Sequence, residues 1–105
     1  MKNDKAEAYT RLLYSIFGEK TDWEKSQPAS DALIAQLDAV LGTLPVREDT
    51  FMRKRFGLEN GEPQFLADLA KFLETSEEEA REFESETMRK LRHPSRSQPL
   101  RDYLD

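Results

Sequence analysis

The chain has 105 residues, enough for one domain with one modest hydrophobic core. It contains no cysteine, which excludes disulfides and thiolate metal sites and favours a cytoplasmic location. The 16 Lys and Arg residues against 21 Asp and Glu give a net charge of −5, the wrong sign for binding nucleic acid mainly by phosphate neutralisation. The longest uncharged apolar stretch, Leu12 to Gly18, is too short to span a bilayer, so we expect no membrane association.

Two helices are predicted in the first 43 residues. Over 5–17 the apolar residues recur at the spacing of one helix face, and over 31–41 a second stripe follows the possible cap Ser30 and ends at Gly42. The polar connector between them contains Trp23, which is too large an apolar side chain to be left free, so we expect it to dock on the core. Residues 1–43 are therefore predicted to be a helical extension that packs on a second unit, residues 44–105.

Three further helices are predicted at 45–56, 64–73 and 77–92. Pro45 suits a first helical turn and Gly57 suits a helix end, while Ser76 and Glu79 match a reciprocal capping box. Pro94 should end the last of these helices, leaving a tail with one more short turn around Leu100. No strand-type alternation occurs, so the predicted fold is all-α, a small bundle of about five helices.

The segments 64–73 and 77–92 form two helices separated by a tight turn. This is the helix-turn-helix pattern, in which the second helix normally enters the major groove of DNA. The spacing alone is a weak signal, because any helical bundle contains such pairs of helices.

Three strings of residues carry a more specific signal. They are Leu-Pro-Val-Arg-Glu at 44–48, Arg-Lys-Arg-Phe-Gly-Leu at 53–58 and Met-Arg-Lys-Leu-Arg-His-Pro-Ser-Arg-Ser at 88–97. Over 44–104 the chain resembles region 4 of primary-type bacterial sigma factors. The resemblance implies a domain that reads the promoter element near −35 through its helix-turn-helix and docks on the flap of the RNA polymerase β subunit.

The resemblance also implies which positions face DNA. They are Arg47, Arg55, Leu66, Glu77, Glu78, Glu79, Arg81, Glu82 and Glu86. Four of them depart from the family, because Glu77 and Glu79 stand where the family has arginine, Glu82 where it has glutamine and Glu86 where it has lysine. A good bidentate base contact contributes about 1–3 kcal/mol, and specific binding exceeds non-specific binding by roughly 4–10 kcal/mol. Four such changes could therefore remove most of that margin.

The charge along the second helix agrees with this interpretation. Residues 77–86 contain six glutamates and one arginine, whereas Arg89, Lys90, Arg92 and Arg96 form a basic stretch behind them. Acids in the first turn also complement the helix dipole, an alternative that covers 77–79 but not the later glutamates.

We therefore expect a transcription-associated binding module that docks on RNA polymerase, a sigma factor or another regulator, with weakened or redirected contact to promoter DNA. The alternative is a conventional sequence-specific DNA-binding regulator that uses Arg47, Arg55, Arg81 and the basic stretch. A third interpretation is a purely structural or interaction bundle.

No catalytic residue, metal ligand or cofactor is predicted. His93 is expected to cap carbonyls at a helix end, since no second ligand or nucleophile partner for it is evident. The three glutamates at 77–79 are not expected to bind a metal ion, because consecutive residues of a helix point in different directions. Five phenylalanines at helix-core spacing are expected to pack in the interior: Phe51, Phe56, Phe65, Phe72 and Phe83.

Overall fold

The computed structural model describes residues 4–17 and 30–104, and six helices account for most of them. The helices are α1 (Asp4–Phe17), α2 (Asp31–Leu41), α3 (Val46–Phe56), α4 (Leu66–Leu73), α5 (Glu77–Arg92) and α6 (Pro94–Leu104). No strand occurs in these two ranges, and the predicted all-α class is confirmed. The helix count is one higher than expected, because the tail forms a complete helix.

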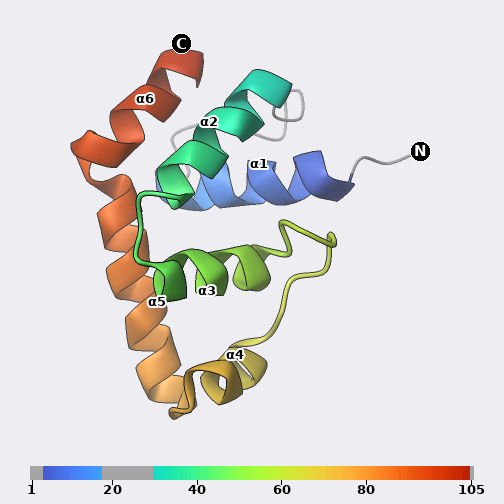
Figure 1. The fold of residues 1–105 in the computed structure, drawn as a ribbon, viewed down its shortest axis with the longest axis vertical. Helices are drawn as coiled ribbons and strands as arrows, with labels where there is room; N and C mark the ends of the chain where they lie inside the picture. The colour runs from blue at the N-terminus through green and yellow to red at the C-terminus, as the bar shows by residue number, and fades with distance from the viewer. Residues whose placement is uncertain (1–3, 18–29, 105) are drawn as a thin grey trace.

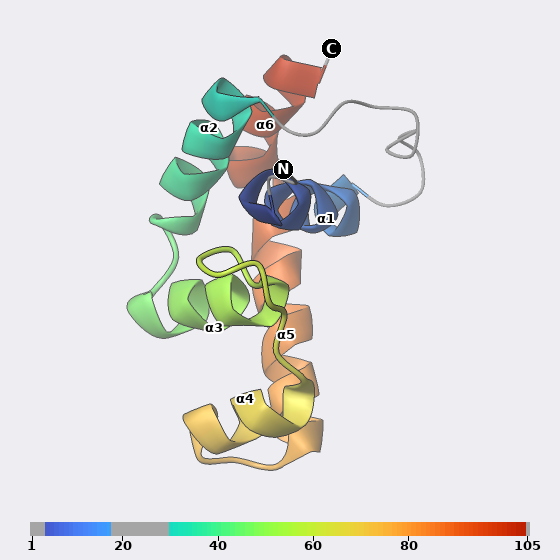
Figure 2. The ribbon, with the colours of Figure 1, turned by 90° about the vertical axis from the view of Figure 1, so that its right-hand side faces the viewer.

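Helix α5 lies along the long axis of the molecule (Figure 1). It runs down one side of the fold, and α4 lies at its lower end, where the two helices pack on each other. Figure 2 shows α1, α3 and α4 at successive levels beside α5, while α2 and α6 lie together at the opposite end. The helix-turn-helix therefore occupies one end of the fold.

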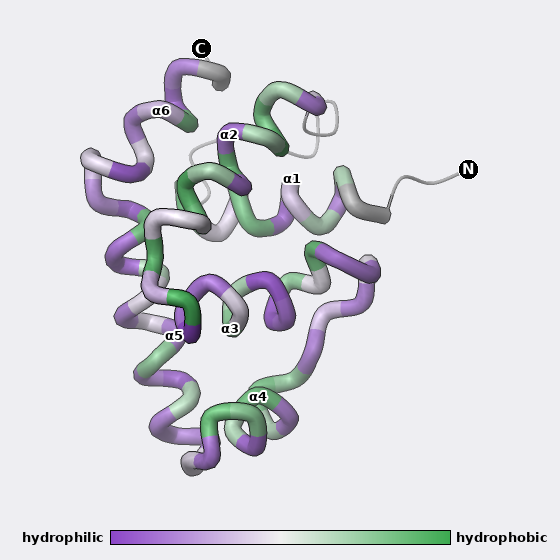
Figure 3. The backbone as a smooth tube through the Cα atoms, in the orientation of Figure 1, coloured by the Kyte–Doolittle hydropathy of each residue, from purple (hydrophilic) through white to green (hydrophobic). Residues whose placement is uncertain are grey.

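One hydrophobic cluster joins all six helices. Its fully buried members include Leu12 and Leu13 of α1, Leu37 of α2, Phe51 of α3, Leu69 of α4, Leu91 of α5 and Leu100 of α6. Figure 3 shows hydrophobic residues interspersed with hydrophilic ones along the helices, most densely on α2 and α4. Residues on both sides of position 43 thus contribute to the same core, while the division into units 1–43 and 44–105 stays a prediction. Trp23 lies outside the described residues.

Side-chain caps mark the starts of α2 and α5. The hydroxyls of Ser30 and Ser76 accept hydrogen bonds from the backbone N–H groups of Leu33 and Glu79, at 3.2 and 3.1 Å. The reciprocal half of the expected capping box is absent, because the Glu79 carboxylate accepts a hydrogen bond from the Thr75 hydroxyl. Helices α3 and α4 begin at residues 46 and 66, one and two positions later than predicted.

Gly57 is required by the loop that follows α3. Its φ of 66° lies in the left-handed region, and a Cβ there would lie 2.5 Å from the carbonyl carbon of Glu62. The chain therefore turns back closely enough for the backbone N–H of Gln64 to donate to the carbonyl of Lys54 at 3.2 Å. This turn delivers the chain to the start of the helix-turn-helix.

The expected short turn in the tail is wrong, since α6 extends over eleven residues. Pro94 ends α5 as predicted but also occupies the first position of α6, where its missing N–H costs nothing. The imidazole Nδ1 of His93 accepts from the backbone N–H of Ser95 at 3.2 Å, and Leu100 is fully buried. The burial of Leu100 against the core stabilises the helix beyond one turn.

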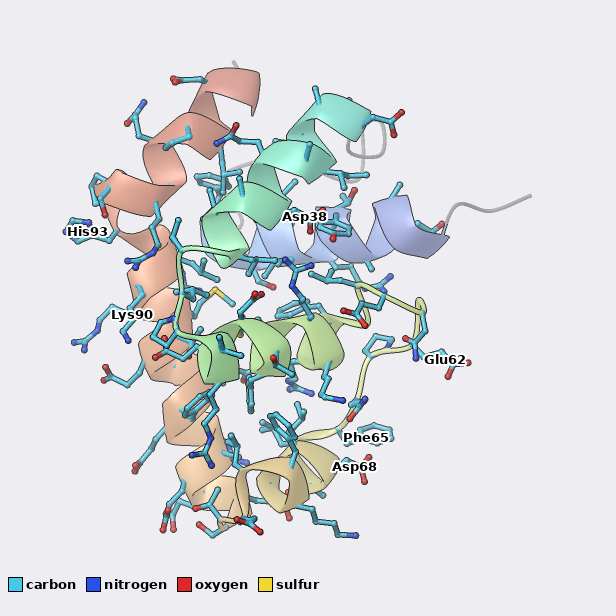
Figure 4. All side chains as sticks on the ribbon, in the orientation of Figure 1. Asp38, Glu62, Phe65, Asp68, Lys90 and His93 are labelled. Atoms are coloured by element: carbon cyan, nitrogen blue, oxygen red, sulfur yellow. The ribbon has the colours of Figure 1, made fainter. Side chains whose placement is uncertain are left out.

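Two of the five phenylalanines contradict the expected interior packing. Phe51 is fully buried with its ring centroid 4.9 Å from that of Phe83, and Phe56 is half-buried. Phe65 and Phe72, in contrast, are 77% and 42% exposed. Phe65 precedes the helix and points away from it (Figure 4), and the inward face of α4 is formed by Leu69, Ala70 and Leu73.

A partly buried polar network ties the first three helices together. The Tyr9 hydroxyl donates to the Asp38 carboxylate, which also accepts from Arg53 Nη1 at 3.0 Å (Figure 4), and Arg53 Nε donates to Asp49 at 2.6 Å. Burial raises the pKa of Tyr9 well above its usual range, and the hydrogen bond to Asp38 adds to this effect.

The network predicts a stability loss at alkaline pH. The pKa of this tyrosine is higher in the folded protein than in the unfolded chain. Its contribution to the free energy of unfolding is therefore complete below about pH 10 and decreases progressively above it. The free energy of unfolding should therefore fall above pH 10 by up to about 1.4 kcal/mol per pH unit. The Tyr9→Phe variant should lack this component in urea titrations between pH 8 and 11. Equal slopes for both proteins would show that Tyr9 is not the group responsible.

The role of α1 in the core is tested by truncating one side chain. Leu13 is fully buried, so Leu13→Ala should lower the free energy of unfolding by about 2–5 kcal/mol. Tyr14→Ala, at a neighbouring position that is 38% exposed, is the matched control and should have a much smaller effect.

Deleting residues 1–29 should lower the melting temperature by several degrees at least. An unchanged melt after the deletion would mean that this segment is an independent appendage.

Candidate nucleic-acid interface

The helix-turn-helix consists of α4, the residues 74–76 and α5. Glu74 adopts the left-handed conformation at φ 58° and ψ 47°, and its N–H donates to the carbonyl of Lys71 at 3.1 Å. Thr75 N–H donates to the carbonyl of Ala70 at 2.9 Å, and Ser76 then caps α5. The turn is closed by backbone bonds, and the fully buried side chains of Leu69 and Ala80 lie in the core below it.

The first three turns of α5 present acidic side chains to solvent. Glu77, Glu78, Glu79, Glu82 and Glu86 are all exposed, and Arg81 is an exposed cation among them. Six of the nine predicted DNA-facing residues are therefore exposed along the first three turns of α5, and we call these six residues the acidic front. Glu86 also pairs with Arg89 one turn later on the helix.

Arg47 is occupied within the fold. Its Nη2 donates to the carbonyl oxygen of Leu73 at 2.7 Å, which satisfies one of the free carbonyls at the end of α4. Because α3 thereby holds the end of α4, this arginine fixes the first helix of the helix-turn-helix. Leu66, another predicted DNA-facing residue, is half-buried and packs against the core.

Arg55 forms an ion pair with α5, the second helix of the helix-turn-helix, which we call the recognition helix in the proposal below. Its Nε lies 2.6 Å from Glu84 Oε2, and its Nη1 donates to the carbonyl of Gln64 at 2.9 Å. Both side chains are largely buried, with 29% and 22% of their surfaces exposed. The pair therefore joins the end of α3 to the middle of α5 and neutralises a cation that the resemblance assigns to DNA.

Glu84 was not among the predicted site residues, although the sequence contained a signal for it. It lies four residues after Ala80 and seven before Leu91, on the helix face that turns toward the core. A carboxylate at an inward position requires a cationic partner. The sequence did not show that this partner would be Arg55.

Three residues of the basic stretch that follows the acidic front bind other parts of the fold. Lys90 Nζ pairs with Glu48 at 2.8 Å, Arg92 donates to the carbonyl of Ser15 at 2.8 Å, and Arg96 donates to the Thr43 hydroxyl at 3.0 Å. These contacts tie α5 and α6 to α3, α1 and the end of α2. His93 is exposed at the junction between α5 and α6, away from the helix-turn-helix (Figure 4).

The described residues define an all-α domain with a helix-turn-helix at one end. Among them, no helix is long and apolar enough to cross a membrane. The same residues contain no group of three His, Asp or Glu side chains that could hold a metal ion.

Comparison with known proteins shows that this domain is similar to part of a sigma factor. The chain is 45% identical over 69 residues to an RNA polymerase sigma factor SigA of Lactococcus lactis subsp. cremoris. The match covers 66% of this chain but only 19% of the relative, so the chain spans about a fifth of that protein. No family model matches. The chain therefore contains a sigma-factor-like region, and its correspondence to region 4 in particular is part of the proposal below.

The left-handed turn predicts a difference between two substitutions at Glu74. A left-handed conformation costs a residue with a Cβ roughly 1–2 kcal/mol, and β-branched residues tolerate it worst. Glu74→Gly should raise the free energy of unfolding by up to about 1 kcal/mol, because the added freedom of the unfolded chain offsets part of the relief. Glu74→Val should lower it. Urea unfolding of both variants checks this, and a destabilising glycine would contradict the left-handed geometry.

Proposed function

We propose that the chain is a non-catalytic, transcription-associated binding module equivalent to sigma region 4. It docks on RNA polymerase or a regulator in the bacterial cytoplasm and contacts promoter DNA weakly or at a different sequence. The observation that carries this proposal is the charge of the recognition helix. Five exposed glutamates occupy its first three turns, where a duplex would bring phosphates.

The placement of the arginines supports weakened DNA contact. Arg47 and Arg55 are hydrogen-bonded to Leu73, Gln64 and Glu84. Withdrawing either guanidinium toward DNA would leave a carbonyl or a largely buried carboxylate without its partner. Arg81 is the remaining cation of the acidic front, and it has no ion pair within the described residues. The five other residues of the acidic front are glutamates.

The exposed aromatic surface supports docking on a protein. Phe65 is 77% exposed and Phe72 is 42% exposed with Lys54 Nζ 5.4 Å from its ring centroid. Exposed apolar side chains that gather into one patch mark protein contact sites, and we propose that Phe65 and Phe72 belong to such a patch. The resemblance names the flap of the polymerase β subunit as one such partner, and a sigma factor or another regulator is a second possibility.

A conventional sequence-specific DNA-binding regulator remains the second candidate function. The observation in its favour is the intact helix-turn-helix scaffold, with its closed turn and capped second helix. This candidate requires the acidic front to tolerate nearby phosphates.

Reversing the charge of the acidic front tests the proposal. The natural chain should bind a duplex containing a consensus −35 element no better than a scrambled duplex. The test variant carries Glu→Arg at positions 77, 79, 82 and 86, a change of about eight charge units. Each restored contact contributes about 1–3 kcal/mol, so the variant should bind the consensus duplex at least about 100-fold more tightly. Fluorescence anisotropy measures both affinities.

A second variant controls for total charge. It carries arginine at four exposed acidic positions outside the helix-turn-helix: Asp31, Glu59, Glu62 and Asp102. It should gain only weak binding that does not distinguish the two duplexes. Nanomolar binding of the natural chain to the consensus duplex, with the scrambled one ignored, would establish the second candidate instead. Equal gains for the two variants would mean that the position of the acids does not matter.

A further inference from the structure

A hollow of about 510 Å³ lies between α1, the end of α3 and α5. Three arginines line it, one from each helix: Arg11 from α1, Arg55 from α3 and Arg92 from α5. Glu84 is its acidic lining residue, and Phe56 and Met88 supply apolar surface. The lining therefore combines a net positive charge with apolar contacts, and its residues Glu84 and Ser85 lie between Glu82 and Glu86 of the acidic front.

Two of the three arginines, Arg55 and Arg92, are held in place by hydrogen bonds and keep donors available. Arg55 uses Nε and Nη1 for Glu84 and Gln64, and Arg92 uses Nε and Nη2 for the carbonyls of Ile16 and Ser15. A guanidinium has five N–H donors, so each retains at least one for a ligand. Arg11 is exposed and makes no ion pair with any of the residues that the structure describes.

We propose that this hollow is a binding site for a phosphate group, with Arg11 as its main ligand-binding residue. Guanidinium groups recognise phosphate by paired charge-assisted hydrogen bonds, and anchored arginines lose little conformational entropy when they bind. The inference goes beyond the proposed function and does not depend on it, because α1 lies outside the segment that resembles sigma region 4.

The size and position of the hollow favour a small phosphate-bearing molecule. Ligand pockets usually span about 300–1,000 Å³ and combine apolar walls with a few polar groups. A nucleotide could place its phosphates on the arginines and its base against Phe56 and Met88. A DNA duplex could supply the same phosphate chemistry, but it would extend toward the acidic front, where Glu78 lies ten residues and about 15 Å along α5 from Met88.

Titration of the full chain tests the site. ATP is the small probe and a twelve-base-pair duplex of arbitrary sequence is the polymeric probe, both measured by isothermal titration calorimetry. Arg11→Gln should weaken binding at least about ten-fold, the usual effect of losing one hydrogen bond to a charged group. Glu84→Gln should strengthen binding, since it removes the carboxylate that opposes the anion. Lys71→Gln is the matched control on α4, an exposed position outside the hollow, and should bind as the natural chain does.

The outcomes separate the two sources of phosphate. One-to-one binding of ATP that is weakened by Arg11→Gln, strengthened by Glu84→Gln and unchanged by Lys71→Gln supports the site and a small ligand. Duplex binding with the same three effects, without ATP binding, supports the phosphate site and assigns it to nucleic acid. Absence of binding to both probes at millimolar concentration overturns the proposal, as does binding that Arg11→Gln and Lys71→Gln change equally. Circular dichroism of the variants confirms that each remains folded.

Discussion

The ion pair between Arg55 and Glu84 joins the helix-turn-helix to the body of the fold. It connects the end of α3 to the middle of α5 and, through the second bond of Arg55 to Gln64, holds the loop that precedes α4. Helix α5 is therefore held against the body by a partly buried charge pair in addition to its core side chains, and removing one partner would leave the other charge partly desolvated and unpaired. The same pair neutralises an arginine that the resemblance to sigma region 4 assigns to DNA, and this arginine also lines the hollow between α1, α3 and α5.

Several basic residues in the described part of the chain hold helices together. Arg47 caps α4, Lys90 joins α5 to α3, and Arg92 joins α5 to the end of α1. The glutamates of the acidic front, in contrast, stay in solvent, where carboxylates repel phosphate. A scaffold of this kind keeps the shape of a helix-turn-helix while its exposed charge disfavours a polyanion, which is the physical basis for proposing a protein partner.

Periodicity and caps were sufficient to predict most of the fold. The apolar stripes and the caps Ser30 and Ser76 placed five helices within two residues of their observed ends. The tail was underestimated, because the burial of Leu100 depends on packing between α6 and the core that no local pattern reveals. Spacing likewise could not distinguish Phe51, which meets Phe83 in the core, from Phe72, which lies on the outer face of α4. The acidic front could be predicted from sequence, whereas the partners of Arg47 and Arg55 come from residues 26 and 29 positions away, a separation at which sequence patterns give no guide.

The salt dependence of DNA binding tests the central claim most directly, namely that this helix-turn-helix does not rely on phosphate neutralisation. The affinity of the natural chain for a duplex carrying the −35 consensus should be measured between 50 and about 200 mM salt, where each neutralised phosphate contributes a slope of about −0.9 in log K against log salt. The account predicts weak binding with a slope no steeper than about −2, equivalent to one or two phosphates. Tight binding with a slope of about −5 or steeper would require several free cations on the DNA-facing surface and would contradict it.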